Sequence, residues 1–186
     1  VLKDNEYLEK AILTGILRVA KESIFSGLNN LYVDSILTNQ FNYFGLSEGE
    51  VLEALKYYER DYEIQEVKEW YNGYTFGKNL VYNPWSIINF IKADELKSFW
   101  VNTSTNDLIR DGLSNLSKSN YNNFVKLTNG ENIDIEIEEN ISFETLERES
   151  TIWNLMMFSG YLSLTENAKI RFVNKEVRNF YTNAFK

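Results

Sequence analysis

The sequence has 186 residues, of which 44% are hydrophobic and 15% aromatic, a composition typical of a folded protein. It contains no Cys and no His, so disulfides, thiol chemistry, Ser-His-Asp triads and His-based metal sites are excluded. Its net charge of −8 repels phosphate backbones, which makes nucleic acid an unexpected partner. No apolar run approaches the roughly 20 residues that cross a bilayer, so we expect no membrane span. The lack of Cys is typical of a cytoplasmic protein.

The first apolar run, residues 11–13, ends in a polar residue, Thr14. A short apolar run of this kind predicts a buried parallel strand, and a helix is the alternative. Because ligands gather at the carboxyl ends of strands in open α/β sheets, Thr14 is a candidate for ligand contact. Arg18 and Lys21 follow it and carry positive charge suited to a phosphate. The alternative is that Thr14 satisfies a local backbone group, while Arg18 and Lys21 are ordinary surface charges.

Two helices are predicted next. Ser47 and Glu50 have the spacing of a capping box, and apolar residues recur at helical spacing after them. This pattern predicts a helix that begins just after Ser47. A second helix is expected over about residues 62–70, because apolar residues there also recur along one face.

Residues 70–90 place aromatic side chains beside turn formers and the only proline of the chain. Three signals in this segment predict, in order, a helix end, a hairpin turn and a helix start: Asn72-Gly73, Gly77-Lys78-Asn79 and Asn83-Pro84. The aromatic side chains are expected to converge on one compact, buried knot made by Trp70, Tyr71, Tyr74, Phe76, Tyr82 and Trp85. Core packing explains such a knot, and a cage that stacks on a ligand is the alternative.

The polar run 102–107 offers N-cap residues for a helix that ends near Leu116, and a further helix is expected over residues 121–127. Strict alternation over residues 133–137 predicts a strand whose polar face carries Asp134 and Glu136. Two acids at alternate positions can suggest a metal site. On an exposed strand they are normally solvated, so we expect no metal site in this chain.

The C-terminal pattern predicts a buried helix over 152–158, strands over 161–165 and 169–173, and a last helix capped by Asn174. This order is typical of a winged-helix-like unit, which binds DNA in some proteins and packs against another domain in others. The unit carries a small basic group: Lys169, Arg171, Lys175 and Arg178. Because so few charges sit on an acidic chain, a packing role is favoured over DNA binding.

Five ordered blocks carry a resemblance that spans nearly the whole chain: 13–33, 70–90, 99–109, 155–164 and 173–180. Together they resemble the AAA-ATPase-like family of bacterial P-loop proteins, which often carry a PD-(D/E)XK nuclease-like domain at the C-terminus. The family's phosphate loop, GxxxxGK(S/T), and its acidic, magnesium-holding strand end are missing from the sequence. The chain therefore resembles the C-terminal half of the ATPase module, cut before the nuclease-like domain.

The resemblance implies a mostly helical α+β fold, in which a helical lid ends in the winged-helix-like unit and an N-terminal strand remains from the P-loop sheet. It divides the chain into a remnant of the P-loop core (1–45), a helical lid with the aromatic knot (46–130), and a strand with the winged-helix-like unit (131–186). It also implies that Thr14 is similar to a sensor residue near the γ-phosphate, with Arg18 and Lys21 as further nucleotide contacts in the intact protein.

The resemblance further implies ATP and Mg as cofactors of the intact protein, with neither bound to this chain alone. The expected partners are the missing P-loop half and a nuclease-like domain, and oligomer formation is left open. We expect a nucleotide-dependent switch that has no catalytic activity by itself. The alternative is a non-enzymatic module that binds protein or nucleic acid, which the missing phosphate loop leaves open.

Overall fold

The computed structural model describes residues 5–12, 19–20, 32, 44–76, 79–101, 107–137, 141–142, 148 and 150–184. Its helices are α2 (Glu48–Tyr57), α3 (Ile64–Tyr71), α4 (Pro84–Ala93), α5 (Asp107–Ser114), α6 (Lys118–Thr128), α7 (Thr151–Phe158) and α8 (Lys175–Ala184). Its strands are β1 (Val19–Ala20), β2 (Tyr74–Phe76), β3 (Asn79–Val81), β4 (Ile141–Ser142), β5 (Leu162–Leu164) and β6 (Ile170–Phe172).

The described residues form an α+β fold in which helices dominate and strands are short, which confirms the predicted class. β2 and β3 form an antiparallel hairpin, β5 and β6 form a second one, and β1 pairs with β4 in parallel. The order of α7, β5, β6 and α8 confirms the helix, hairpin and helix expected at the C-terminal end. No helix among the described residues has both the length and the apolar character that crossing a membrane requires.

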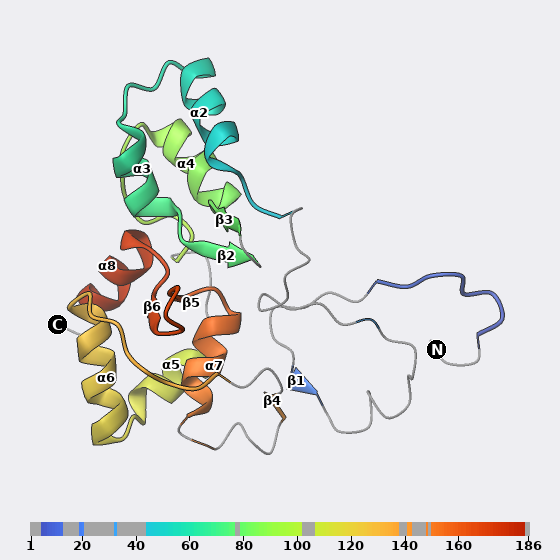
Figure 1. The fold of residues 1–186 in the computed structure, drawn as a ribbon, viewed down its shortest axis with the longest axis vertical. Helices are drawn as coiled ribbons and strands as arrows, with labels where there is room; N and C mark the ends of the chain where they lie inside the picture. The colour runs from blue at the N-terminus through green and yellow to red at the C-terminus, as the bar shows by residue number, and fades with distance from the viewer. Residues whose placement is uncertain are drawn as a thin grey trace.

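The buried apolar side chains form two separate clusters. The N-terminal core lies among α2, α3 and α4 and consists of Val51, Leu55, Val67, Tyr71, Tyr82, Ile87, Phe90 and Ile91. The C-terminal core lies among α5 to α8 and the β5–β6 hairpin, and its largest fully buried side chains are Trp153, Phe124, Leu127, Met156, Met157 and Ile170. Figure 1 shows α2 to α4 at one end and α5 to α7 at the other, with β2 and α8 between them. Specific contacts must therefore join two packing units.

Side-chain caps begin two helices of the N-terminal core as the sequence predicts. The Ser47 hydroxyl accepts a hydrogen bond from the Glu50 N–H, and the Glu50 carboxylate accepts one from the Ser47 N–H at 2.7 Å, which completes the capping box. Asn83 Oδ1 accepts from the Trp85 N–H at 2.9 Å, with Pro84 at the first position of α4. These caps satisfy donors that the first helical turn leaves unpaired, so they fix where the helices begin.

The strand predicted over residues 133–137 is wrong. Ile133 makes a single antiparallel bridge to Ile170, in which each N–H donates to the other residue's carbonyl, and the following residues are irregular. Asp134 and Glu136 are exposed, as expected for solvated carboxylates. The alternation of the sequence therefore reports alternating burial beside β6 without a continuing ladder.

The strand predicted over residues 11–13 is also wrong at the two positions that the structure describes. Ala11 and Ile12 are exposed and irregular, so they cannot belong to a buried strand. Leu13 lies outside the described residues. The strand described in this part of the chain is β1, which pairs with β4 in parallel.

Trp85 contradicts the prediction of a buried knot. Its side chain is 52% exposed at the first turn of α4. Trp85 is exposed because α4 packs only one of its faces against the N-terminal core. Trp85 and Ile88 lie on the opposite face. The buried face consists of Ser86, Ile87, Phe90 and Ile91.

Trp153 and Trp85 should therefore contribute very different amounts to the stability of the fold. Trp153 is 1% exposed, and its Nε1 donates to Asn120 Oδ1 at 3.1 Å. We predict that Trp153→Ala lowers the free energy of unfolding by about 3–5 kcal/mol, as for large aromatics truncated in cores. Trp85→Ala should lower it by less than about 1 kcal/mol, since half of that side chain is already in water. Urea denaturation of both variants measures the two free energies of unfolding. Equal losses in the two variants would contradict the assignment of Trp153 as buried and Trp85 as exposed.

Candidate functional site

The three residues predicted to contact nucleotide, Thr14, Arg18 and Lys21, lie outside the described residues. Their role therefore stays a prediction. Among the residues that the structure does describe, no three side chains of the metal-binding types gather into a group that could hold an ion. The candidate site is instead the junction of the two cores, where the aromatic segment meets the start of α8.

The aromatic segment is divided between the two cores and does not form one knot. Tyr71 and Tyr82 are fully buried in the N-terminal core, and Trp70 packs at its edge. Tyr74 packs against the C-terminal core, where its ring meets the edge of Trp100 with centroids 6.2 Å apart. The prediction of a single compact knot is wrong, because β2 leaves one core and enters the other.

The buried rings leave no open face for a stacked ligand. Tyr71 lies 5.4 Å from Phe90 and 6.2 Å from Phe99, measured between ring centroids. Phe76 is half-buried on β2. The packing therefore favours a structural role for these rings over the cage that the sequence left open.

Gly73 allows the two units to meet at the end of α3. Its φ is +108°, a backbone conformation that residues other than glycine rarely adopt. A Cβ at this position would lie 2.0 Å from the Val173 carbonyl oxygen. Asn72 caps α3 just before it, which confirms the predicted helix end. The backbone at Gly73 thus packs directly on the backbone that leads into α8.

Glu176 is the central polar residue of the junction. It lies in the first turn of α8 and is 0% exposed. Its carboxylate accepts a hydrogen bond from the Ser86 hydroxyl of α4 at 2.8 Å and one from the Phe99 N–H at 2.7 Å. It accepts another, short hydrogen bond from the Trp100 N–H. One carboxylate of the C-terminal unit therefore binds a helix of the N-terminal unit and the segment that joins them.

Burial raises the pKa of Glu176 above its ordinary value, because the apolar surroundings penalise the charged form. The hydrogen bonds from Ser86, Phe99 and Trp100 act in the opposite direction, since they stabilise the carboxylate. The raised pKa means that burial outweighs these bonds. The charged form of this carboxyl group is therefore held at a cost in stability.

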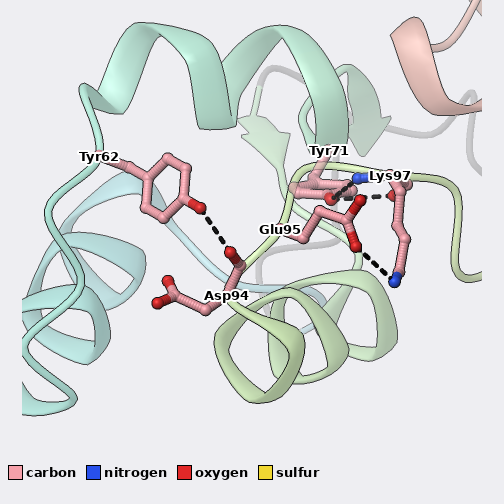
Figure 2. Close-up of polar contacts among 5 residues, drawn as sticks. All are labelled: Tyr62, Tyr71, Asp94, Glu95 and Lys97. Carbon is pink, nitrogen blue, oxygen red and sulfur yellow. Dashed lines mark hydrogen bonds and ion pairs between the residues drawn. The ribbon is translucent and has the colours of Figure 1, made fainter.

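Residues 94–101, which follow α4, form a segment that we name the connector. It has no helix or strand, and side chains hold it in place (Figure 2). The Tyr62 hydroxyl donates to the Asp94 carbonyl at 2.7 Å. The Tyr71 hydroxyl donates to the Lys97 carbonyl at 2.9 Å and accepts from the Lys97 N–H at 3.1 Å. Burial also raises the pKa of Tyr71, so this hydroxyl keeps its proton. The connector thus obtains from tyrosines the partners that a helix or strand would supply.

Two buried polar atoms of the junction have no hydrogen-bond partner among the described residues: the Tyr74 hydroxyl and Asn174 Nδ2. Asn174 Oδ1 accepts from the Val177 N–H at 3.1 Å, which confirms the predicted cap of α8. Burial raises the pKa of Tyr74, and the side chains of Asn83 and Asn174 partly oppose this shift. The junction therefore combines a satisfied carboxylate with unused hydrogen-bonding capacity beside it.

Sequence reasoning missed Glu176 as a member of the site. A Glu in the first turn of a helix normally faces water and interacts with the helix dipole. The sequence offered one indication of its burial, which is its position on the helix. Glu176 adjoins Val177, and Val177 lies on the buried face of α8 with Tyr181. Nothing in the sequence identified its donors, which come from residues 76 to 90 positions earlier in the chain.

Comparison with known proteins gives one partial relative. The chain is 30% identical over 115 residues to "Uncharacterized protein in vnfD 5'region" of Azotobacter chroococcum mcd 1. The match covers 61% of this chain and 22% of the relative, so the chain spans about a fifth of that protein's length. No family model and no solved structure matches the chain.

Two substitutions at Glu176 separate its hydrogen bonds from its charge. Glu176→Ala leaves three buried or half-buried donors without an acceptor, at about 1–3 kcal/mol each, and removes a buried charge. We predict a net loss of about 2–4 kcal/mol in the free energy of unfolding. Glu176→Gln should lose less than about 1 kcal/mol, because its oxygen still accepts from the connector and the Ser86 hydroxyl can accept from its amide. Glu166→Ala, at an exposed site, is the control. Equal losses for Ala and Gln would contradict this account.

The raised pKa of Glu176 predicts a dependence on pH. A group whose pKa is raised by folding contributes stability below its unfolded value, here 4.5, and loses that contribution as the pH rises through its folded value. The wild type should therefore lose stability relative to Glu176→Gln as the pH is raised from about 4.5 toward 7. Urea titrations of both proteins at several pH values measure this difference, in which the other titrating groups cancel. A constant difference over that range would show that the pKa is not raised.

Proposed function

We propose that this chain is the sensor and lid part of an AAA-ATPase-like P-loop protein, where it acts as a nucleotide-dependent switch coupled to a nuclease-like domain. One observation carries the proposal: blocks of the sequence that resemble the family meet at the junction. The blocks 70–90 and 99–109 contain Ser86 and Phe99, and both residues donate hydrogen bonds to Glu176 in the block 173–180. Three of the five blocks meet in this one interaction, which supports a role for it in the proposed function.

In the proposed role the chain supplies contacts and a moving unit, and the chemistry lies elsewhere. Phosphoryl transfer depends on a phosphate cradle and a magnesium ion, and the sequence holds no phosphate loop. ATP and Mg would bind to the P-loop half of the intact protein, with Thr14, Arg18 and Lys21 as contacts from this chain. The longer relative, of which this chain spans about a fifth, is consistent with such a division of labour. The cytoplasm is the compartment expected for this protein.

A second candidate is a non-enzymatic module that recruits a protein partner. The observation that favours it is the outer face of α4, where Trp85 and Ile88 lie one turn apart and are about half exposed. Exposed aromatic side chains are common anchors of protein interfaces. The two candidates predict different effects of mutation. The first predicts that turnover of the longer protein depends on Arg18, and the second predicts that partner binding depends on Trp85.

The first test is nucleotide binding by the chain alone. We predict that calorimetry with Mg-ATP detects binding no tighter than about millimolar and that no hydrolysis exceeds background, because the phosphate cradle is missing. Micromolar binding that requires magnesium would contradict the proposal.

The second test uses the longer protein that contains the P-loop half. Arg18→Ala should lower kcat with little change in the affinity for ATP, since a charge that acts mainly in the transition state contributes mostly to turnover. Lys10→Ala, which removes an exposed charge from the same region, is the control and should leave kcat unchanged. Normal turnover of the Arg18 variant, together with loss of a binding partner in Trp85→Ala, would favour the interaction module.

A further inference from the structure

Arg171 is a half-buried cation with no anionic partner among the residues that the structure describes. It lies on β6, and burial lowers the pKa of its guanidinium, although the group stays charged. No carboxylate of the described residues lies within ion-pair distance of it. Its Nη1 donates to the Val173 carbonyl at 3.2 Å, so the described residues accept from one of its five N–H donors. Buried charges are normally paired, so this environment favours a missing anion.

Two hydroxyl groups lie on the same side of the hairpins as Arg171. Ser163 is directly opposite Arg171 in the β5–β6 register, and both therefore lie on one face of that hairpin. The Ser163 hydroxyl is 3.3 Å from the Thr75 hydroxyl of β2. That pair shares one hydrogen bond, so one hydroxyl proton stays available to an acceptor.

Gly73 lies beside the guanidinium, at the point where the two backbones pack directly on each other. It precedes Thr75 of β2 by two residues. Arg171 Nη2 lies 3.4 Å from the place that a Cβ on Gly73 would occupy. The facing sides of β2 and the β5–β6 hairpin thus bring a guanidinium and two hydroxyls together in a seam beside the Gly73 backbone.

We propose that this seam, formed by Arg171, Ser163, Thr75 and the backbone at Gly73, is a binding site for a single phosphate group. A guanidinium offers parallel N–H donors to two oxygens of an oxyanion, and the hydroxyl pair offers a donor from another direction. A tetrahedral phosphate has oxygens for both directions, whereas a planar carboxylate is satisfied by the guanidinium alone. The net charge of −8 disfavours a polyanion such as nucleic acid, so the ligand is a small phosphate compound.

This site does not depend on the proposed lid function, because it uses none of the N-terminal residues. The test is a titration of the labelled 186-residue chain with sodium phosphate at constant ionic strength, followed by the Arg171 Nε–H and Gly73 amide signals in NMR spectra. We expect saturable shifts with half-saturation in the millimolar range. Sodium acetate at the same concentrations should give much smaller shifts.

Matched variants decide the assignment. Arg171→Gln should abolish the saturable shift of the Gly73 amide, and Arg171→Lys should weaken binding severalfold, because it keeps the charge and loses the fork. Lys169→Gln removes the same charge from an exposed position two residues earlier and should bind phosphate as the wild type does. Should Arg171→Gln fail to fold, Thr75→Val replaces it and should weaken binding. No saturable shift in the wild type, equal shifts with acetate, or unchanged binding in Arg171→Gln or Thr75→Val would overturn the proposal.

Discussion

A buried carboxyl group, paired with no cation of the described residues, constrains the rest of this structure. Glu176 is removed from water completely, and a charge in that position persists only when hydrogen-bond donors replace its hydration. Those donors are the Ser86 hydroxyl and the N–H groups of Phe99 and Trp100. They belong to α4 and to the connector, whereas Glu176 belongs to α8. The position of one core relative to the other therefore follows from where a single side chain finds its donors.

The connector shows the same dependence of backbone on side chains. It forms no helix or strand, yet Tyr62 and Tyr71 of the N-terminal unit satisfy its polar groups from one side (Figure 2), and Ser98 donates to the Glu176 carbonyl on the other. Irregular backbone at a junction is stable only when such partners exist. In the proposed switch this arrangement implies that the two cores move together, and that motion takes place outside the junction.

Gly73 and Arg171 mark a second contact between the two units, of a different kind. There the backbones approach too closely for a side chain at Gly73, and the facing strand surfaces carry hydroxyls and a guanidinium in place of apolar groups. A polar seam between two apolar cores is unfavourable unless its groups find partners. The Glu176 side has its partners within the chain, whereas on the Arg171 side the described residues accept from one of the five guanidinium N–H groups.

The sequence by itself determined the α+β class, the capping box at Ser47, the cap at Asn83 and the helix-hairpin-helix order of the C-terminal end. These features depend on backbone and side-chain groups within a few residues of one another, which local patterns report directly. Only the tertiary structure decided that Trp85 faces outward, that the aromatic segment is shared between two cores, and that Glu176 is buried. The physical reason is distance along the chain, since Ser86 and Glu176 are 90 residues apart, and no local pattern tells a helix which distant donor its side chain will meet.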